Sequence, residues 1–426
     1  MGSKKYQSQR MNIRLLLFAV VLFLLDLYVF QAFRWSFRNW TSSGQRILFG
    51  FYWFLSFSCI LLPLAAMLKP WSEWSHGLRT YSSAFVFVLV LSKLFIVIFL
   101  LTDDILRLIK FTWSKIAPAP SSAPAVNTIS RSDFLVRAGL VVAAVPFVSL
   151  LWGMVKGAYS IQIRKQTLAF KKLPPIFKGF KIVQISDFHV GSFISSEPVE
   201  AAVKQINALE PDIILFTGDL VNNLKSEIEP HMEALSKLKA KHGIYSILGN
   251  HDYGDYVIWE TPEAKKKNLQ DLVDAQRKLG WDLLLDEHRE IQKEDASIYL
   301  VGVQNYSMHL RFPKYGNLTK ASHGMEDQDT VTILMSHDPS HWRGEVLSKF
   351  PNIDLTLSGH THGFQFGIEI PGFRWSPVQY VYKDWAGKYA QGEQYLYVNR
   401  GIGFLGYPGR VGILPEITLI ELEKDA

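Results

Sequence analysis

The stretch "GNHDYGD", residues 249–255, places an amide, an imidazole and a carboxylate side by side. It follows the short apolar run "GIYSIL", residues 243–248, which has the composition of a buried β-strand. Three consecutive polar groups are poor material for a protein core. We therefore expect the strand to end at a functional site and to aim Asn250, His251 and Asp252 at a ligand.

Four more apolar runs end in polar residues in the same way. "FKIVQIS" leads into Asp187, "DIILFTG" into Asp219, "TVTILMS" into His337 and "IDLTLSG" into His360. Amphipathic segments between the runs predict helices at residues 197–209, 227–242 and 262–279. Alternating strands and helices are typical of a layered α/β fold, in which ligands gather beyond the carboxyl ends of the strands.

Any one of these polar endings alone could be a helix cap or a turn, but five in one chain make coincidence improbable. The side chains expected to bind metal are Asp187, His189, Asp219, Asn250, His337, His360 and His362. Because the single cysteine, Cys59, lies elsewhere, the donors are oxygen and imidazole nitrogen, which suit Mn, Fe or Zn.

Two metal ions about 3.5–4 Å apart require a shared ligand, and a carboxylate can bridge them. We expect Asp219 to be this bridge. The first ion would then also bind Asp187, His189 and His362, and the second Asn250, His337 and His360. The same ligands accept several divalent ions, so the sequence leaves the identity of the two cations open.

The motifs "DFH" (187–189), "GDLVNN" (218–223), "GNHD" (249–252), "SHDP" (336–339) and "GHTHG" (359–363) together resemble the motif series of the calcineurin-like metallophosphoesterases. The resemblance extends over residues 180–426 and implies a four-layer α/β/β/α sandwich with two metals at its edge. It also implies that Asn250 is a metal ligand and that His251 is the general acid or stabilises charge at the leaving oxygen. Asp252 would hold the imidazole of His251.

The ending "VNRGIGFLGYPGRVGILPEITLIEL", residues 398–422, is similar to a bacterial membrane-associated subgroup of that family. The resemblance implies a phosphodiester or pyrophosphate substrate, because the subgroup includes phosphodiesterases and UDP-diacylglucosamine hydrolases of lipid A synthesis. Arg400 and Arg410 lie in this glycine-rich tail. They are candidates for contact with substrate phosphate, and ordinary surface arginines are the alternative.

The first third of the chain is dominated by apolar residues. A helix needs about 20 mostly apolar residues to cross a bilayer, and four stretches qualify, at residues 13–33, 47–68, 84–101 and 134–154. We therefore predict a transmembrane region of about four helices at residues 1–158 and a catalytic domain at residues 159–426. The Pro/Ser/Ala-rich stretch at residues 117–130 is predicted to be an extended, exposed linker.

Asp26 and Lys93 lie inside two of the predicted spans. A charge at membrane depth is costly unless it is paired or turned inward. Either the two side chains form an interhelical pair, or Lys93 extends to the interface and Asp26 is protonated.

Basic residues before the first span and after the fourth favour the cytoplasm for both ends. Against this, residues 130–147 resemble a twin-arginine export signal in which Ser132 replaces the second arginine. We expect an integral protein of the bacterial inner membrane whose catalytic domain faces the cytoplasm.

The charge and the aromatic residues bear on the partners. A formal net charge of +6 with no long basic block does not favour nucleic acid as a partner.

The aromatic stretch at residues 363–385 follows the two histidines of "GHTHG". It suggests a lipid-linked substrate or, alternatively, a hairpin that packs on the sandwich. Three functions stay open: hydrolysis of a lipid-linked substrate, hydrolysis of cell-wall or soluble nucleotide phosphodiesters, and phosphate binding by a transporter or sensor without turnover.

Overall fold

The structure is a computed structural model that describes residues 2–69, 71–116, 131–325 and 329–425. The chain forms two compact units, Met1–Trp152 and Gly153–Ala426. The predicted domain boundary after residue 158 falls in the short segment between the last long helix and the first strand. The predicted linker at residues 117–130 lies outside the described residues.

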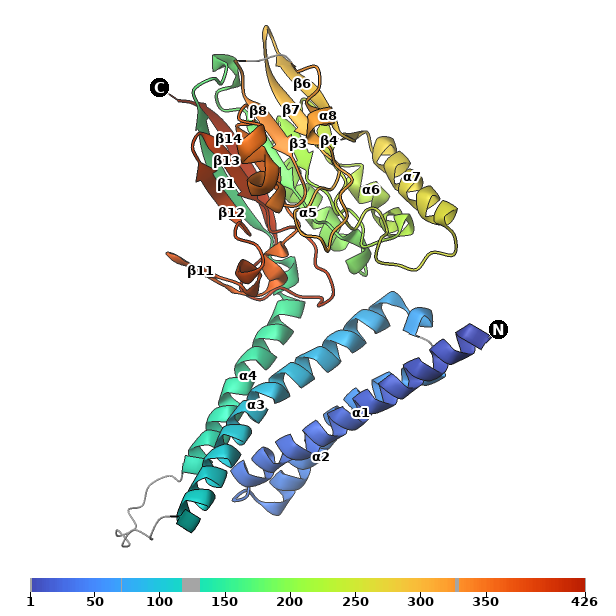
Figure 1. Ribbon diagram of the computed structural model, residues 1–426, viewed down its shortest axis with the longest axis vertical. Helices are drawn as coiled ribbons and strands as arrows, with labels where there is room; N and C mark the ends of the chain where they lie inside the picture. Colours follow the sequence, from blue (N-terminus) through green and yellow to red (C-terminus); the bar gives the residue numbers. More distant parts are fainter. Residues whose placement is uncertain (1, 70, 117–130, 326–328, 426) are drawn as a thin grey trace. The chain divides into compact units, whose positions relative to one another are not determined.

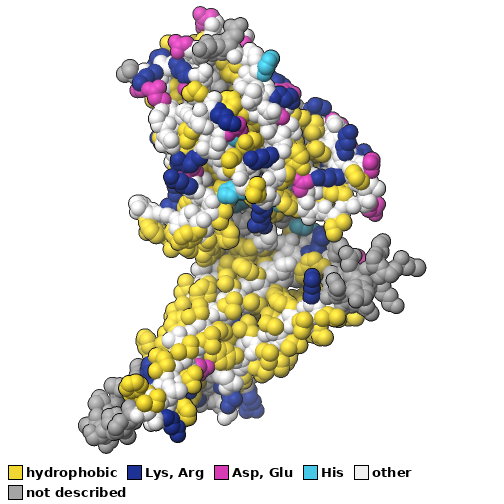
Figure 2. All heavy atoms as spheres, viewed as in Figure 1, with side chains coloured by type: hydrophobic (Ala, Val, Ile, Leu, Met, Phe, Trp, Pro, Cys, Tyr) yellow, Lys and Arg dark blue, Asp and Glu magenta, His cyan; other side chains and the backbone are white. Residues whose placement is uncertain are grey.

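The first unit consists of long helices (Figure 1). These are α1 (Gly2–Ser36), α2 (Ser42–Leu68), α3 (His76–Ile116) and α4 (Arg131–Val155). All four are long and apolar enough to cross a membrane, which confirms the four predicted spans. Figure 2 shows hydrophobic side chains over most of the visible surface of this unit, as expected of helices that face lipid.

Asp26 and Lys93 form the ion pair that the sequence left as one of two alternatives. Both side chains are buried, with 2% and 9% of their surface exposed. The hydroxyl of Ser56 on α2 donates to the Asp26 carboxylate over 2.9 Å and accepts from Lys93 Nζ over 3.1 Å. The pair therefore joins three helices, and extension of Lys93 to the interface is the wrong alternative.

The second unit contains two six-stranded sheets (Figure 1). The first sheet has the order β1-β14-β2-β3-β4-β5, formed by β1 (Gln162–Phe170), β2 (Lys181–Ile185), β3 (Ile213–Phe216), β4 (Ile244–Ser246), β5 (Asp282–Leu283) and β14 (Glu416–Lys424). The second has the order β12-β13-β9-β8-β7-β6, formed by β6 (Glu287–Lys293), β7 (Ala296–Gly302), β8 (Thr332–Met335), β9 (Leu355–Ser358), β12 (Gly387–Gln391) and β13 (Gln394–Val398). A separate pair of strands, β10 (Ile368–Ile370) and β11 (Phe373–Trp375), belongs to neither sheet.

Three apolar clusters hold the layers together. Side chains of the two sheets meet in a buried core that includes Ile182, Leu215, Ile333 and Leu355. The other face of the first sheet packs on α5 (Glu197–Asn207), α6 (Met232–Leu235) and α7 (Pro262–Lys278). The other face of the second sheet is covered by α8 (Leu318–Ala321) and by the segment 342–349, which ends in α9 (Leu347–Lys349). This order of layers confirms the four-layer α/β/β/α sandwich.

Two of the three predicted helices of this unit are confirmed as α5 and α7. The expected helix at residues 227–242 is wrong in extent. The structure has a 3-10 helix, Lys225–His231, followed by the single turn of α6. Pro230 lies inside this segment and has no backbone N–H to donate, which disfavours a continuous α-helix there.

Candidate metal centre

The five strands with polar endings bring those endings to one edge of the sandwich. β2, β3 and β4 are parallel neighbours in the first sheet, and β8 and β9 are parallel neighbours in the second. The carboxyl ends of parallel strands lie at the same edge of a sheet. The residues that follow these ends are Asp187, Asp219, Asn250, His337 and His360.

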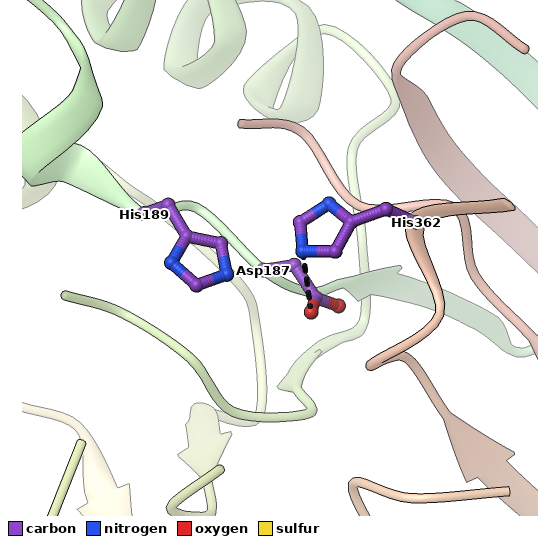
Figure 3. Close-up of side chains that lie close together, drawn as sticks. All are labelled: Asp187, His189 and His362. Carbon is purple, nitrogen blue, oxygen red and sulfur yellow. Dashed lines mark ion pairs between the residues drawn. The ribbon is translucent and has the colours of Figure 1, made fainter. Parts of the chain in front are cut away.

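One group of candidate ligands consists of Asp187, His189 and His362, all buried (Figure 3). Their donor atoms lie within 4.8 Å of one another, and His362 Nε2 is 3.3 Å from Asp187 Oδ1. Figure 3 shows the His362 ring directed at the carboxylate from a segment far along the chain from Asp187. Packing of the two sheets, rather than any local motif, therefore assembles this group.

A second group consists of Asp219, His337 and His360, whose donor atoms also lie within 4.8 Å of one another. His337 Nε2 is 3.1 Å from Asp219 Oδ2. Asn250 joins this group because its side-chain oxygen is 2.8 Å from His360 Nδ1. The two groups are those expected from the sequence.

Asp219 lies between the groups. Its Oδ2 atom is 3.1 Å from His337 Nε2 in the second group and 3.5 Å from His189 Nε2 in the first. A single carboxylate with histidines of both groups in reach fits the shared ligand that two adjacent cations require.

Hydrogen bonds orient two of the histidines for metal binding. Nε2 of His189 is buried and has no hydrogen-bond partner among the described residues, and Nε2 of His337 lies 3.1 Å from Asp219 Oδ2. The opposite nitrogen, Nδ1, is held by the side-chain oxygen of Asn222 in His189 and by the carbonyl of Thr217 in His337. Because a carbonyl oxygen can only accept, Nδ1 carries a proton in both residues, and Nε2 is the atom that faces the site. The residues therefore fit a bound metal.

Burial keeps most of these imidazoles neutral. It lowers the pKa of His189 to about 3 and that of His360 to about 4, so both are in the ligand form at neutral pH. His337 differs: burial acts to lower its pKa, but the Asp219 carboxylate outweighs this effect and raises the pKa to about 10. A proton and a metal ion therefore compete for His337 Nε2.

The carboxylates also suit cations. Burial raises the pKa of Asp187 to about 6, because a buried anion without a full counter-charge is unfavourable. At Asp219 burial acts in the same direction, but His337, His251 and His189 outweigh it and hold the pKa well below its usual range. The anionic form of Asp219 is thus the stable one, as a bridging ligand requires.

The backbone at the site is strained. Five of the seven candidate ligands have positive φ angles: Asp187, His189, Asp219, His360 and His362. For residues other than glycine such conformations cost about 1–3 kcal/mol each and persist mainly where function requires them. Close packing adds to the constraint, because a Cβ atom at Gly249 would lie 2.2 Å from Asp219 Oδ1 and one at Gly359 2.2 Å from Asp187 Oδ2.

The structure places His251 at the site but corrects the role expected for Asp252. The His251 ring lies 4.9 Å from that of His189, and its Nδ1 is 2.8 Å from the carbonyl oxygen of Asn222. The Asp252 carboxylate does not reach the imidazole in the described structure; it accepts backbone N–H groups of Asp219, Leu220, Val221 and Gly249. Asp252 therefore holds the loop of the bridging aspartate, and Asn222 holds His251.

The positions of Arg400 and Arg410 argue against the expected contact with substrate phosphate. Arg400 is 2% exposed and is ion-paired with Glu416 and Glu369. Arg410 is 1% exposed, and its guanidinium donates to the carbonyl of Gly403 and lies 3.2 Å from His362 Nδ1. The Arg400 guanidinium neutralises the buried Glu416 and the partly buried Glu369, and the Arg410 guanidinium packs against His362, a candidate ligand.

Three site residues were not singled out from the sequence. Asn222 lies within the quoted motif "GDLVNN" and could have been suspected from it. Tyr256 accepts from the Asn250 amide over 2.8 Å, and the Tyr382 hydroxyl is 2.8 Å from His360 Nε2. Tyr382 lies within the aromatic stretch 363–385 and Tyr256 within the aromatic stretch 253–259, but no local pattern distinguishes either tyrosine from its neighbours, and both reach the site from loops.

Comparison with known proteins adds two family matches. Residues 10–158 match a family described as probable calcineurin-like phosphoesterase, transmembrane domain, and residues 180–364 match one described as calcineurin-like phosphoesterase. The two matches divide the chain between helices and sandwich, as the structure does.

Individual relatives agree with these matches. The metallophosphoesterase YkuE of Bacillus subtilis is 31% identical, over 62% of this chain and 87% of its own length. Proteins named "Transmembrane protein with metallophosphoesterase domain" are 27% identical in Danio rerio and 29% in Bos taurus, over 71% and 70% of this chain. The match spans 66% and 65% of the length of these two proteins, so about a third of each lies outside it.

Proposed function

This chain belongs to the calcineurin-like metallophosphoesterase family, and we propose that it is a membrane-bound hydrolase of phosphodiester or pyrophosphate bonds. The observation that carries the proposal is the set of seven oxygen and nitrogen donors, divided into two groups around the Asp219 carboxylate. An α/β sandwich has no structural need for five polar residues with strained backbones, four of them buried, at one edge.

The proposed cofactors are two divalent ions, with Mn, Fe and Zn all compatible with the donors. Asp187, His189 and His362 would hold one ion, Asn250, His337 and His360 the other, and Asp219 both. When bound, such ions lower the pKa of coordinated water and neutralise charge on phosphate oxygens.

The chain itself supplies the proton. His251 has its Nδ1 fixed on the Asn222 carbonyl, which leaves Nε2 as the atom that can deliver a proton to the leaving oxygen. Asn222 supports both this ring and that of His189, so one residue sets the geometry of the acid relative to a ligand.

For the substrate we propose a lipid-linked phosphodiester or pyrophosphate, such as UDP-diacylglucosamine. Four membrane-spanning helices and exposed apolar side chains in the segment 363–385, directly after a candidate ligand, support this choice. The alternatives are a cell-wall or soluble nucleotide phosphodiester, and phosphate binding without turnover by a sensor or transporter. We place the protein in the bacterial inner membrane with the catalytic unit in the cytoplasm, on the strength of the basic residues that flank the spans.

The test uses the full chain in nanodiscs with Mn²⁺. Turnover of bis(p-nitrophenyl) phosphate is expected, and its absence in a protein that still binds phosphate would favour the sensor. UDP-diacylglucosamine is expected to be hydrolysed faster than a water-soluble UDP-sugar, and the reverse preference would refute the lipid-linked substrate. His251→Ala should lose about 10²- to 10⁴-fold in turnover and retain metal, whereas Asp219→Ala should lose both.

A further inference from the structure

The hairpin formed by β10 and β11 carries an exposed apolar surface. Its two strands pair only with each other in the described structure. Ile368, Ile370 and Phe373 are each about half exposed, at 48%, 58% and 53%. Figure 2 shows hydrophobic side chains gathered where Figure 1 places β11. We call these three residues, together with the exposed Phe364, Tyr380 and Val381, the hairpin patch.

Backbone hydrogen bonds fix this hairpin to the last turn of α4. The N–H of Arg410 donates to the carbonyl of Gly153, in that turn, over 3.1 Å. The next residue, Val411, donates to Gln365 and accepts from Gly367, over 2.8 and 2.9 Å. One short loop therefore joins the end of α4 to the residues that lead into β10.

Two further contacts lie close to this attachment. A Cβ atom at Gly157, just after α4, would lie 2.0 Å from the Arg410 carbonyl oxygen, so the two backbones are in direct contact. On the other side, the guanidinium of Arg164 in β1 pairs with Glu369 in β10 over 2.6 Å. The segment that leaves α4 thus holds the hairpin at two points.

The attachment of the hairpin near the end of α4 bears on what contacts the hairpin patch. α4 is long and apolar enough to cross the membrane, and Gly153 and Gly157 lie at its end. The end of a membrane-spanning helix lies near the lipid headgroups, so a surface attached within a few residues of it is close to that layer. The composition also fits this depth, because Trp375 and Tyr380 are of the type enriched at membrane interfaces and Lys383 is exposed beside them.

We propose that the hairpin patch inserts into the headgroup region of the bilayer that α4 crosses. The catalytic unit then binds the membrane through its own surface as well as through its covalent connection to α4. This interaction stands whether or not the chain hydrolyses a lipid-linked substrate, since it depends on the hairpin and on α4 alone.

The experiment measures the depth of the hairpin tip. In a Cys59→Ser background, which removes the single cysteine, Phe373→Cys and Asp295→Cys are labelled with an NBD fluorophore. Asp295 is the control, because it is an exposed polar residue in the turn of another hairpin, between β6 and β7. The full chain is placed in phosphatidylcholine/phosphatidylglycerol nanodiscs with and without spin-labelled lipid.

The label at position 373 is expected to emit at shorter wavelength and to be quenched several-fold more strongly by spin-labelled lipid than the label at position 295. Equal quenching at the two positions would overturn the proposal. A blue shift at position 373 without lipid quenching would overturn it too, because it would indicate a protein partner or a second copy. Ile370→Cys, on the other side of the turn, replaces Phe373→Cys if that variant folds poorly.

Discussion

Tyr382 offers the sharpest test of how the second metal group is held. Its hydroxyl donates to the Asp338 carboxylate over 3.1 Å, so it accepts from His360 Nε2, 2.8 Å away. This arrangement protonates Nε2 and leaves the Nδ1 lone pair of His360 beside the Asn250 oxygen, in the direction of the proposed ion. Tyr382→Phe removes both hydrogen bonds and preserves the ring.

The size of the effect follows from those two bonds. Loss of a hydrogen bond that orients a metal-binding histidine lowers metal affinity about 10- to 100-fold, which corresponds to about 1.4–2.7 kcal/mol. Only the second ion should be affected, because Asp187, His189 and His362 have no contact with Tyr382 among those that the structure describes. Metal is removed with a chelator and titrated back into the protein, and the heat of binding is measured by calorimetry. In Tyr382→Phe, one site should keep its affinity for metal and the other should bind metal more weakly.

Tyr380→Phe is the matched control. Tyr380 lies two residues before Tyr382 and is 77% exposed, and its hydroxyl accepts from the Trp375 indole over 3.3 Å rather than from His360. The affinity of the Tyr380→Phe variant for both ions should equal that of the unaltered chain. Equal affinities in Tyr382→Phe, or an equal loss in Tyr380→Phe, would refute the role of Tyr382 in positioning His360.

Three other changes have defined outcomes. Asp26→Asn and Lys93→Met should each destabilise the helical unit by about 3–5 kcal/mol, because each leaves a buried charge unpaired. In reversible unfolding, the double variant should lose less free energy of unfolding than the sum of the two single losses. Additive losses would refute the coupling between the two residues. Chelation should lower the unfolding free energy of the catalytic unit by about 4 kcal/mol per site at a metal concentration 1,000-fold above Kd, measured as a melting temperature that metal restores. Asp252→Asn should cost about 1–3 kcal/mol in denaturant unfolding, because the buried N–H groups of Asp219 and Gly249 lose the carboxylate oxygen that accepts from both. Full stability with lost turnover would instead support a direct role of Asp252 in orienting His251.

The sequence predicted much of the candidate site because the signals there are local. An apolar run of strand length followed by a polar residue is visible within ten residues, and five such runs locate Asp187, Asp219, Asn250, His337 and His360. The membrane helices are equally visible, since a bilayer imposes a minimum length of apolar chain. Even the pairing of Asp26 with Lys93 could be suspected, because an isolated charge in the membrane is unfavourable.

Hydrogen-bond partners could not be predicted in this way. Asp252 adjoins His251 in sequence, yet consecutive side chains on a turn diverge, and the imidazole is held by the Asn222 carbonyl instead. Arg400 and Arg410 lie in a glycine-rich tail that suggested an exposed loop. Their burial depends on Glu369, Glu416 and His362, which approach only when the hairpin and β14 pack beside the tail.

The sequence by itself thus indicated the candidate metal ligands, the five strands that lead into them and the four membrane helices, since periodicity and length are properties of short segments. Only the tertiary structure decided the hydrogen bond from His251 to the Asn222 carbonyl, the support of His360 by Tyr382 and the attachment of the hairpin to α4. The physical reason is that these depend on contacts between segments far apart in the chain. Packing of the two sheets fixes such contacts, and no local pattern encodes them.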